Sequence, residues 1–218
     1  MPASKVSMFG NPFVGIFAKT NDKITLAGKT VSDKFIRSLE VLGTEVIRLS
    51  INDCYLIGLY SAINNKGMVF SQLASEIEVK DIKASDYNIV RCKLTATGNN
   101  IVANDYGAIV NPDTEESEIK KIKDALDVEV VRSTIAGYKT VGAMVLVTNK
   151  GFIAHPKISA SEIELLKSIF HVDGGVGTSN MGVPFPGISI IANKNGFIVG
   201  ELTTGFETGR INDCLGFI

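Results

Sequence analysis

The chain has 218 residues and a formal net charge of −1, from 22 basic and 23 acidic side chains. Its composition, 45% hydrophobic and 21% charged, is that of an ordinary folded protein and excludes a disordered chain. The charge is spread evenly along the chain, which argues against a generic DNA-binding protein. The longest uninterrupted apolar stretch, residues 141–147, is too short to span a bilayer. Asn11 and Pro12 interrupt the apolar start of the chain, so we expect no signal peptide.

The cysteines bear on the compartment in which the protein works. Cys54, Cys92 and Cys214 lie far apart and show no CxxC spacing. An odd number of scattered cysteines predicts reduced thiols, and therefore a cytoplasmic protein.

Turns of similar sequence recur along the chain and point to an internal repeat. They are Asn65-Lys66-Gly67, Asp105-Tyr106-Gly107, Asn149-Lys150-Gly151 and Asn195-Gly196. Nine residues before the glycine of each turn stands another glycine, namely Gly58, Gly98, Gly142 and Gly187. A fifth unit, with one residue deleted, places Gly15 before the turn that contains Lys23. The spacings between successive leading glycines are 43, 40, 44 and 45 residues, and this regularity predicts five repeats.

Each unit has the same predicted order of elements. A β-branched run opens the unit, and a loop leads to the leading glycine and a second strand. The turn follows, because Asn, Asp and Gly tolerate positive φ and close hairpins, and then come a third strand and an amphipathic helix. The opening runs are residues 6–9, 46–51, 89–94, 128–135 and, more weakly, 170–172. The predicted helices cover residues 32–42, 76–82, 159–170 and 207–215, and a further helix starts at 113–116. Ser159-Ala160-Ser161-Glu162 is a predicted capping box at the start of helix 159–170.

A unit of about forty residues with three strands and one helix cannot bury its own sheet face, so it needs neighbours. We therefore predict an α/β protein in which five pseudo-symmetric β-β-β-α repeats form a closed ring and a single domain. Closure is favoured because the ends lack polar capping repeats and the chain begins with a strand that the last unit could use. The predicted units are 5–43, 44–84, 85–127, 128–171 and 172–218, with strand 6–9 closing the ring.

Few residues suggest catalysis or metal binding. Ala27-Gly28-Lys29-Thr30 lacks the first glycine of a P-loop and is interpreted as a turn after a strand. Gly174-Gly175-Val176-Gly177 follows a helix instead of opening one, so we interpret it as a loop and not as a dinucleotide site. His155 and His171 supply no metal-ligand spacing. A catalytic pair of Cys214 with a histidine stays open, although Cys214 falls at an apolar helix position, where a buried and inert thiol is the simpler interpretation.

Small polar residues recur at the leading glycines, as in Gly98-Asn99-Asn100, Gly142-Ala143 and Pro186-Gly187. A pseudo-symmetric ring brings equivalent loops to one face, and a flat, mildly charged face suits a broad macromolecular partner. The alternative is that the glycines only serve packing near the axis. For Asn99 and Asn65 we favour contact with a partner.

Several longer motifs occur in a fixed order along the chain. They are Gly10-Asn11-Pro12 with Gly15, Phe17-Ala18-Lys19, Gly98-Asn99, Asn104-Asp105-Tyr106-Gly107-Ala108-Ile109-Val110, Thr140-Val141-Gly142, Thr148-Asn149-Lys150-Gly151, His155-Pro156, and Thr203-Thr204-Gly205 with Glu207. Together, on a fivefold repeat, they resemble the translation initiation factor 6 family over essentially the whole chain. The chain stops just after its last helix and so is similar to the archaeal members.

The resemblance implies a pentein-type ring that acts as a monomer without cofactor or metal. It also implies binding to the large ribosomal subunit, on the intersubunit side near the sarcin–ricin loop and neighbouring ribosomal proteins, which blocks the small subunit. The candidate ribosome-binding residues are Asn65, Gly98, Asn99, Asn149 and Lys150. The chain departs from the family in Asn180-Met181-Gly182, where the family often has a basic middle residue.

Pentein rings also include guanidine-modifying hydrolases and transferases with a Cys nucleophile. Those enzymes carry their catalytic groups on inserted loops, whereas these repeats have no long insertions. We therefore expect a protein that is not an enzyme, with the hydrolase or transferase as the alternative.

Overall fold

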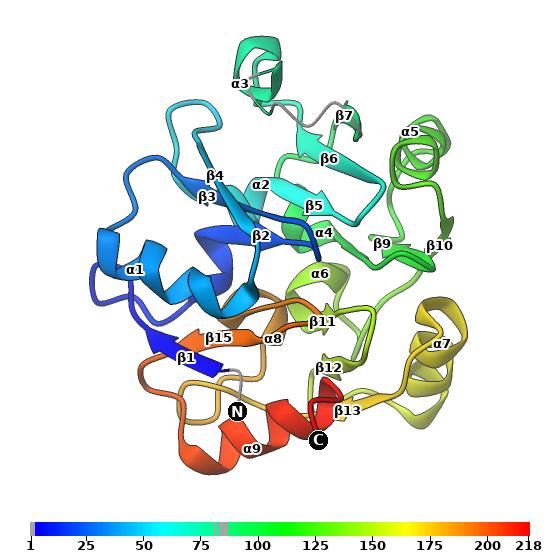
Figure 1. Ribbon diagram of the computed structural model, residues 1–218. Helices are drawn as coiled ribbons and strands as arrows, with labels where there is room; N and C mark the ends of the chain where they lie inside the picture. The colour runs from blue at the N-terminus through cyan, green and yellow to red at the C-terminus, as the bar shows by residue number, and fades with distance from the viewer. Residues whose placement is uncertain (1–2, 81, 83–86) are drawn as a thin grey trace.

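Five three-stranded sheets surround a common axis in the computed structural model, which describes residues 3–80, 82 and 87–218 (Figure 1). Four sheets are built from consecutive strands. These are β2 (Ala18–Thr20), β3 (Ile24–Gly28) and β4 (Glu45–Leu49); β5 (Ser61–Ile63), β6 (Gly67–Ser71) and β7 (Asn88–Cys92); β8 (Ile101–Ala103), β9 (Gly107–Val110) and β10 (Glu129–Arg132); and β11 (Val145–Val147), β12 (Phe152–Ala154) and β13 (Gly174–Val176).

These four sheets have the same pairing. The first two strands form an antiparallel hairpin, and the third strand, reached through a helix, lies parallel to the second. The β-branched run that opens each sequence unit therefore completes the sheet of the unit before it. Strand β4, for example, pairs with β3 from Ile24↔Glu45 to Gly28↔Leu49.

The fifth sheet joins the two ends of the chain. It consists of β14 (Ile190–Ala192), β15 (Phe197–Gly200) and β1 (Ala3–Val6), with β1 parallel to β15 from Ala3↔Phe197 to Val6↔Gly200. The predicted strand at 6–9 was placed too late. Phe9 and Gly10 have φ of 53° and 76°, so the chain turns there and bridges Met8 to Asn11.

Long helices lie outside the sheets (Figure 1). The predicted ones are found as α1 (Asp33–Ser38) with a 3₁₀ extension η2 (Leu39–Leu42), α3 (Glu76–Lys80), α5 (Glu116–Leu126), α7 (Ala160–Phe170) and α9 (Gly205–Cys214). The capping box of Ser159 and Glu162 at α7 is confirmed, and Thr204 with Glu207 forms a second one at α9. Residue 81 of the predicted helix 76–82 lies outside the described residues.

Two predictions around the fourth helix were wrong. Residues 170–172 are not a strand, because α7 runs to Phe170 and His171 ends it in the left-handed conformation. Gly174-Gly175-Val176 is not a loop but strand β13. The glycine at its start is needed because a Cβ on Gly174 would lie 2.3 Å from the carbonyl oxygen of Phe152. Its two glycines, which are uncommon in strands, hid this strand from the sequence pattern.

The leading glycines lie in short helical turns and not in loops. The turns are η1 (Val14–Ile16), α2 (Ile57–Tyr60), α4 (Thr97–Asn100), α6 (Val141–Met144) and α8 (Pro186–Ser189), and each contacts the next, with α8 against η1. A Cβ on Gly98 would lie 1.9 Å from the carbonyl oxygen of Gly58, and Gly58, Gly142 and Gly187 meet the preceding glycine in the same way. We call these four with Gly15 the glycine stack.

The core is divided among clusters that fill the spaces between neighbouring units. Their largest fully buried side chains are Phe35, Phe70, Phe152, Phe170 and Phe197. Each cluster draws residues from two units, so no unit could bury its apolar face alone. Within the described part of the chain, no helix combines the length and apolar character needed to cross a membrane.

Candidate functional site

The axis has two different ends. One end, which we call the hairpin end, is formed by the hairpin turns 21–23, 64–66, 104–106, 148–150 and 193–195. The other end, which we call the helical-turn end, is formed by η1, α2, α4, α6 and α8. A three-residue strand separates the ends in each unit, a distance of about 10 Å. The structure thus does not bring all the predicted contact residues together. Asn65, Asn149 and Lys150 lie at the hairpin end, and Gly98 and Asn99 lie at the helical-turn end.

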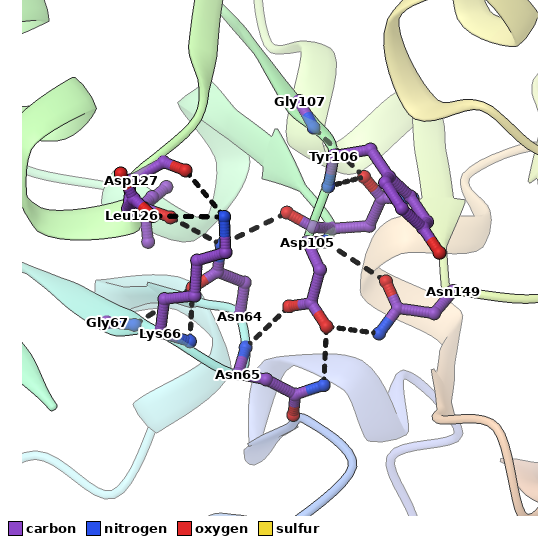
Figure 2. Close-up of polar contacts among 11 residues, drawn as sticks. Asn64, Asn65, Lys66, Gly67, Asp105, Tyr106, Gly107, Leu126, Asp127 and Asn149 are labelled. Carbon is purple, nitrogen blue, oxygen red and sulfur yellow. Dashed lines mark hydrogen bonds and ion pairs between the residues drawn. The ribbon is translucent and has the colours of Figure 1, made fainter. Parts of the chain in front are cut away.

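At the hairpin end, Asn65 and Asn149 belong to a cycle of side chains with Asp22 and Asp105, which we call the amide–carboxylate ring. Figure 2 shows the contacts of Asn65 and Asn149 with Asp105. The Nδ2 group of Asn65 donates to Asp22 Oδ2 at 3.0 Å and to Asp105 Oδ2 at 2.6 Å. Asn149 Nδ2 donates to the same two oxygens at 2.8 and 2.7 Å. Each of these two Oδ2 atoms therefore accepts two hydrogen bonds, and no side-chain amide hydrogen of either asparagine is left over.

Backbone groups tie the ring to the turns. The N–H of Asp22 donates to Asn65 Oδ1, that of Asn65 to Asp105 Oδ1, and that of Asp105 to Asn149 Oδ1, at 2.8 to 3.0 Å. The preceding residue of each turn adds a second set of contacts. Asn64 Oδ1 accepts from Lys66 and Gly67, while its Nδ2 donates to the carbonyls of Asn104 and Leu126 (Figure 2). The side chains of Asn65 and Asn149 are thus engaged within the protein, which favours a structural role.

The fifth turn interrupts this pattern. The N–H of Lys194 donates to Asp22 Oδ1 at 3.0 Å, but a lysine side chain cannot accept the N–H of Asn149 in return. Among the described residues, the N–H of Asn149 has no hydrogen-bond partner.

Replacing Lys194 with asparagine should supply the missing acceptor. The free energy of unfolding should rise by about 1 kcal/mol, the usual net value of one hydrogen bond. Urea unfolding followed by circular dichroism measures it. The matched variant Lys194→Ala removes the lysine without adding an acceptor and should change stability by less than about 0.5 kcal/mol. Equal gains in both variants would contradict the proposed acceptor role.

At the helical-turn end, Asn99 offers a free side chain. Asn99 is half-buried, and its carboxamide has no hydrogen-bond partner among the described residues, whereas Asn100 bonds to Ala96 and Asn111. Gly98 next to it is buried in the glycine stack, so it packs against Gly58 and cannot offer a side chain to a partner. The structure supports the packing interpretation for this glycine.

Tight turns with positive φ also lie at the helical-turn end, and two of them expose apolar side chains. Phe9 and Met181 have φ of 53° and 62°, and each is 73% exposed. Leu202 and Phe206 near the start of α9 are 54% and 88% exposed. Large exposed apolar side chains are unfavourable for stability, so this end is a candidate interaction surface.

Glu207 holds the turn of Met181 in place. Its carboxylate accepts hydrogen bonds from the N–H groups of Met181 and Gly182 at 3.2 and 2.8 Å, and from the hydroxyl of Thr178 at 2.8 Å. It also caps α9 through Thr204. Burial by itself raises the pKa of Glu207, but the hydrogen bonds from Thr204, Gly182 and Thr178 outweigh it and lower the pKa to about 2.

The residues of the alternative enzyme site do not form one. Cys214 is buried, its sulfur lies 3.9 Å from the carbonyl oxygen of Val176, and burial raises the pKa of its thiol. His155 packs against Tyr138 and Phe185, and its Nδ1 accepts the N–H of Lys157 at 3.1 Å. Burial also lowers the pKa of His155. No group of three or more potential metal ligands occurs among the described residues.

Asp22 and Asp105 were not predicted as partners of the two asparagines. Their signal was present, because Asp22, Asn65, Asp105, Asn149 and Lys194 are equivalent residues of five aligned turns. Lys150, the remaining candidate, is exposed and lies with its ammonium 4.6 Å from the ring centre of Phe217.

Comparison with known proteins places these features in a family. A model of the eIF-6 family matches residues 3–214. Translation initiation factor 6 of Picrophilus torridus is 38% identical over 214 residues, covering 97% of this chain and 98% of the relative. Proteins of the same name from Pyrococcus abyssi and Methanosarcina acetivorans are 37% and 35% identical, and cover 100% and 98% of both chains. Over its full length, therefore, this chain belongs to the eIF-6 family of non-enzymatic translation factors, together with archaeal relatives.

Proposed function

We propose that the protein binds the large ribosomal subunit on its intersubunit face and prevents premature association with the small subunit, acting as a monomer in the cytoplasm. The observation that carries this proposal is the similarity to translation initiation factor 6 over the whole chain. With a net charge of −1, bulk attraction to rRNA phosphates contributes little, so shape and specific polar contacts have to supply the affinity.

Within this function, we propose the helical-turn end as the contact surface. Asn99 presents an unpartnered carboxamide there, and Phe9, Met181 and Phe206 expose apolar side chains at the same end. At the hairpin end, by contrast, the amide hydrogens of Asn65 and Asn149 are used within the amide–carboxylate ring. These differences favour Asn99 over Asn65 and Asn149 as a residue that touches the ribosome.

The function is tested by sedimentation through a sucrose gradient. The protein should migrate with separated large subunits and not with small subunits, and adding it before the small subunits should reduce the formation of joined ribosomes. Equal migration with small subunits would count decisively against the proposal.

The choice of surface is tested by two single substitutions. Asn99→Ala should weaken binding to the large subunit by about 1–3 kcal/mol, because a polar partner on the ribosome is left unpaired. Its free energy of unfolding should change by less than about 0.5 kcal/mol, since the Asn99 side chain has no hydrogen bond to lose within the described part of the chain. Lys150→Ala, at the opposite end, should leave affinity unchanged. The opposite result, with Lys150→Ala weakening binding and Asn99→Ala not, would place the contact at the hairpin end.

A further inference from the structure

A small cavity on the axis contains a charged residue that the proposed ribosome contact does not use. The cavity has a volume of about 30 Å³ and is lined by residues of all five units. It lies between the glycine stack and the amide–carboxylate ring, whose residues line the adjoining cavity. Lys19 is the single charged residue in its lining.

The lysine is an exception to the repeat. Lys19 is the middle residue of β2, and the middle residues of the equivalent strands β5, β8, β11 and β14 are Ala62, Val102, Leu146 and Ile191. The other four units thus have apolar side chains at this position. The fold itself does not require a cation there.

No charged group in the part of the chain that the structure describes neutralises this lysine. Among the described residues, Lys19 forms no ion pair, and its ammonium donates no hydrogen bond to a protein acceptor. The carboxylates of Asp22 and Asp105 belong to the adjoining cavity and already accept amide and backbone hydrogen bonds. Although the residue as a whole is half-buried, its ammonium lies deep enough for burial alone to lower the pKa of Lys19 to about 8. A buried ammonium without a counter-charge is unfavourable, so a neutralising ligand is expected.

We propose that the axial cavity binds one small monatomic anion, such as chloride, beside Lys19. The volume is sufficient for one particle of about the size of a water molecule. It is too small for an organic carboxylate with its chain. The rest of the lining is apolar apart from backbone groups and Thr20. Among the described residues that line the cavity, Lys19 is therefore the one cationic group that could hold the ion. Bound there, the anion stabilises the charged form of Lys19 and links the five units through the axis.

The test uses bromide, which replaces chloride and scatters anomalously. A crystal of the full chain grown in sodium bromide at pH 7 should show an anomalous peak within hydrogen-bond distance of Lys19 Nζ. The peak should be absent in Lys19→Met, a variant that should fold because the other units have apolar residues at this position. Its occupancy should fall as the pH rises above 8, because the neutral amine no longer attracts an anion.

A solution measurement gives an independent answer. At equal ionic strength, the Tm of the unmodified protein should be higher in sodium chloride than in sodium gluconate, whose anion cannot enter the cavity. The difference should disappear in Lys19→Met. A bromide map without a peak at Lys19, or a chloride effect of equal size in the variant, would overturn the proposal.

Discussion

Replacing Gly98 with alanine should lower the free energy of unfolding by about 4 kcal/mol or more, the largest effect expected of any single substitution here. The new Cβ would lie 1.9 Å from the carbonyl oxygen of Gly58 and 2.8 Å from that of Ser61. Both obstacles are backbone atoms, so no side chain can rotate away, and α4 would have to separate from α2. Because each helical turn contacts the next, the displacement would spread through the glycine stack. Thermal and urea unfolding measure the loss.

The matched control is Gly209→Ala. Gly209 lies within α9, and nothing lies within 4 Å of the position that its Cβ would occupy. Alanine is the better helix former, so this variant should gain about 0.5–1 kcal/mol. If Gly98→Ala were as stable as the parent protein, the turns could not be packed as closely as described.

Replacing Glu207 with glutamine should lower the free energy of unfolding by about 3 kcal/mol at pH 7. The carboxylate is buried, caps α9 through Thr204 and holds the turn of Met181 and Gly182, and glutamine cannot accept all of these hydrogen bonds. The magnitude also follows from the depressed pKa. A group that titrates at about 2 in the folded protein and at about 4.3 in the unfolded chain contributes roughly 3 kcal/mol when fully ionised.

The stabilisation by Glu207 should depend on pH, and the lowered pKa sets the direction of that dependence. Because the folded-state pKa of Glu207 is lowered, its stabilisation is fully present above about pH 4.3 and is lost as the pH falls toward 2. The stability difference between the parent protein and Glu207→Gln should therefore shrink between pH 5 and pH 2. As a control, Glu164→Gln on the exposed face of α7 should change stability by less than about 0.5 kcal/mol. A difference that does not depend on pH would mean that Glu207 stabilises by shape and not by charge.

The repeat made most of the fold predictable from the sequence. The turn glycines and leading glycines predict where the hairpins lie, and the capping box of Ser159 predicts where α7 starts. The hairpins and the helix start are visible in the sequence because they depend on local backbone conformation. Pairing between strands is not local. The sequence shows that residues 46–51 form a strand, but only the structure shows that this strand completes the sheet of the preceding unit.

The candidate site was less predictable for a related reason. Aligned repeats show which residues are equivalent, but not whether a side chain faces a partner or its own neighbours. Asn65 and Asn99 look alike in sequence, yet the side chain of the first donates to two carboxylates and that of the second has no hydrogen-bond partner among the described residues. The difference comes from Asp22 and Asp105, which lie in the two neighbouring units and meet Asn65 only when the units pack side by side.

The pairing of β1 with β15 affects how the chain is made. Strand β1 is translated first, whereas its partner begins only at Phe197. The first four sheets can form one after another as the chain emerges, since each needs only the segment that follows it. The fifth must wait for nearly the entire polypeptide, and this long-range contact makes the last step of folding slow. A nascent chain that stalls just before β15 would carry four finished sheets and two unpaired strands, β1 and β14, and would be open to pairing with another chain.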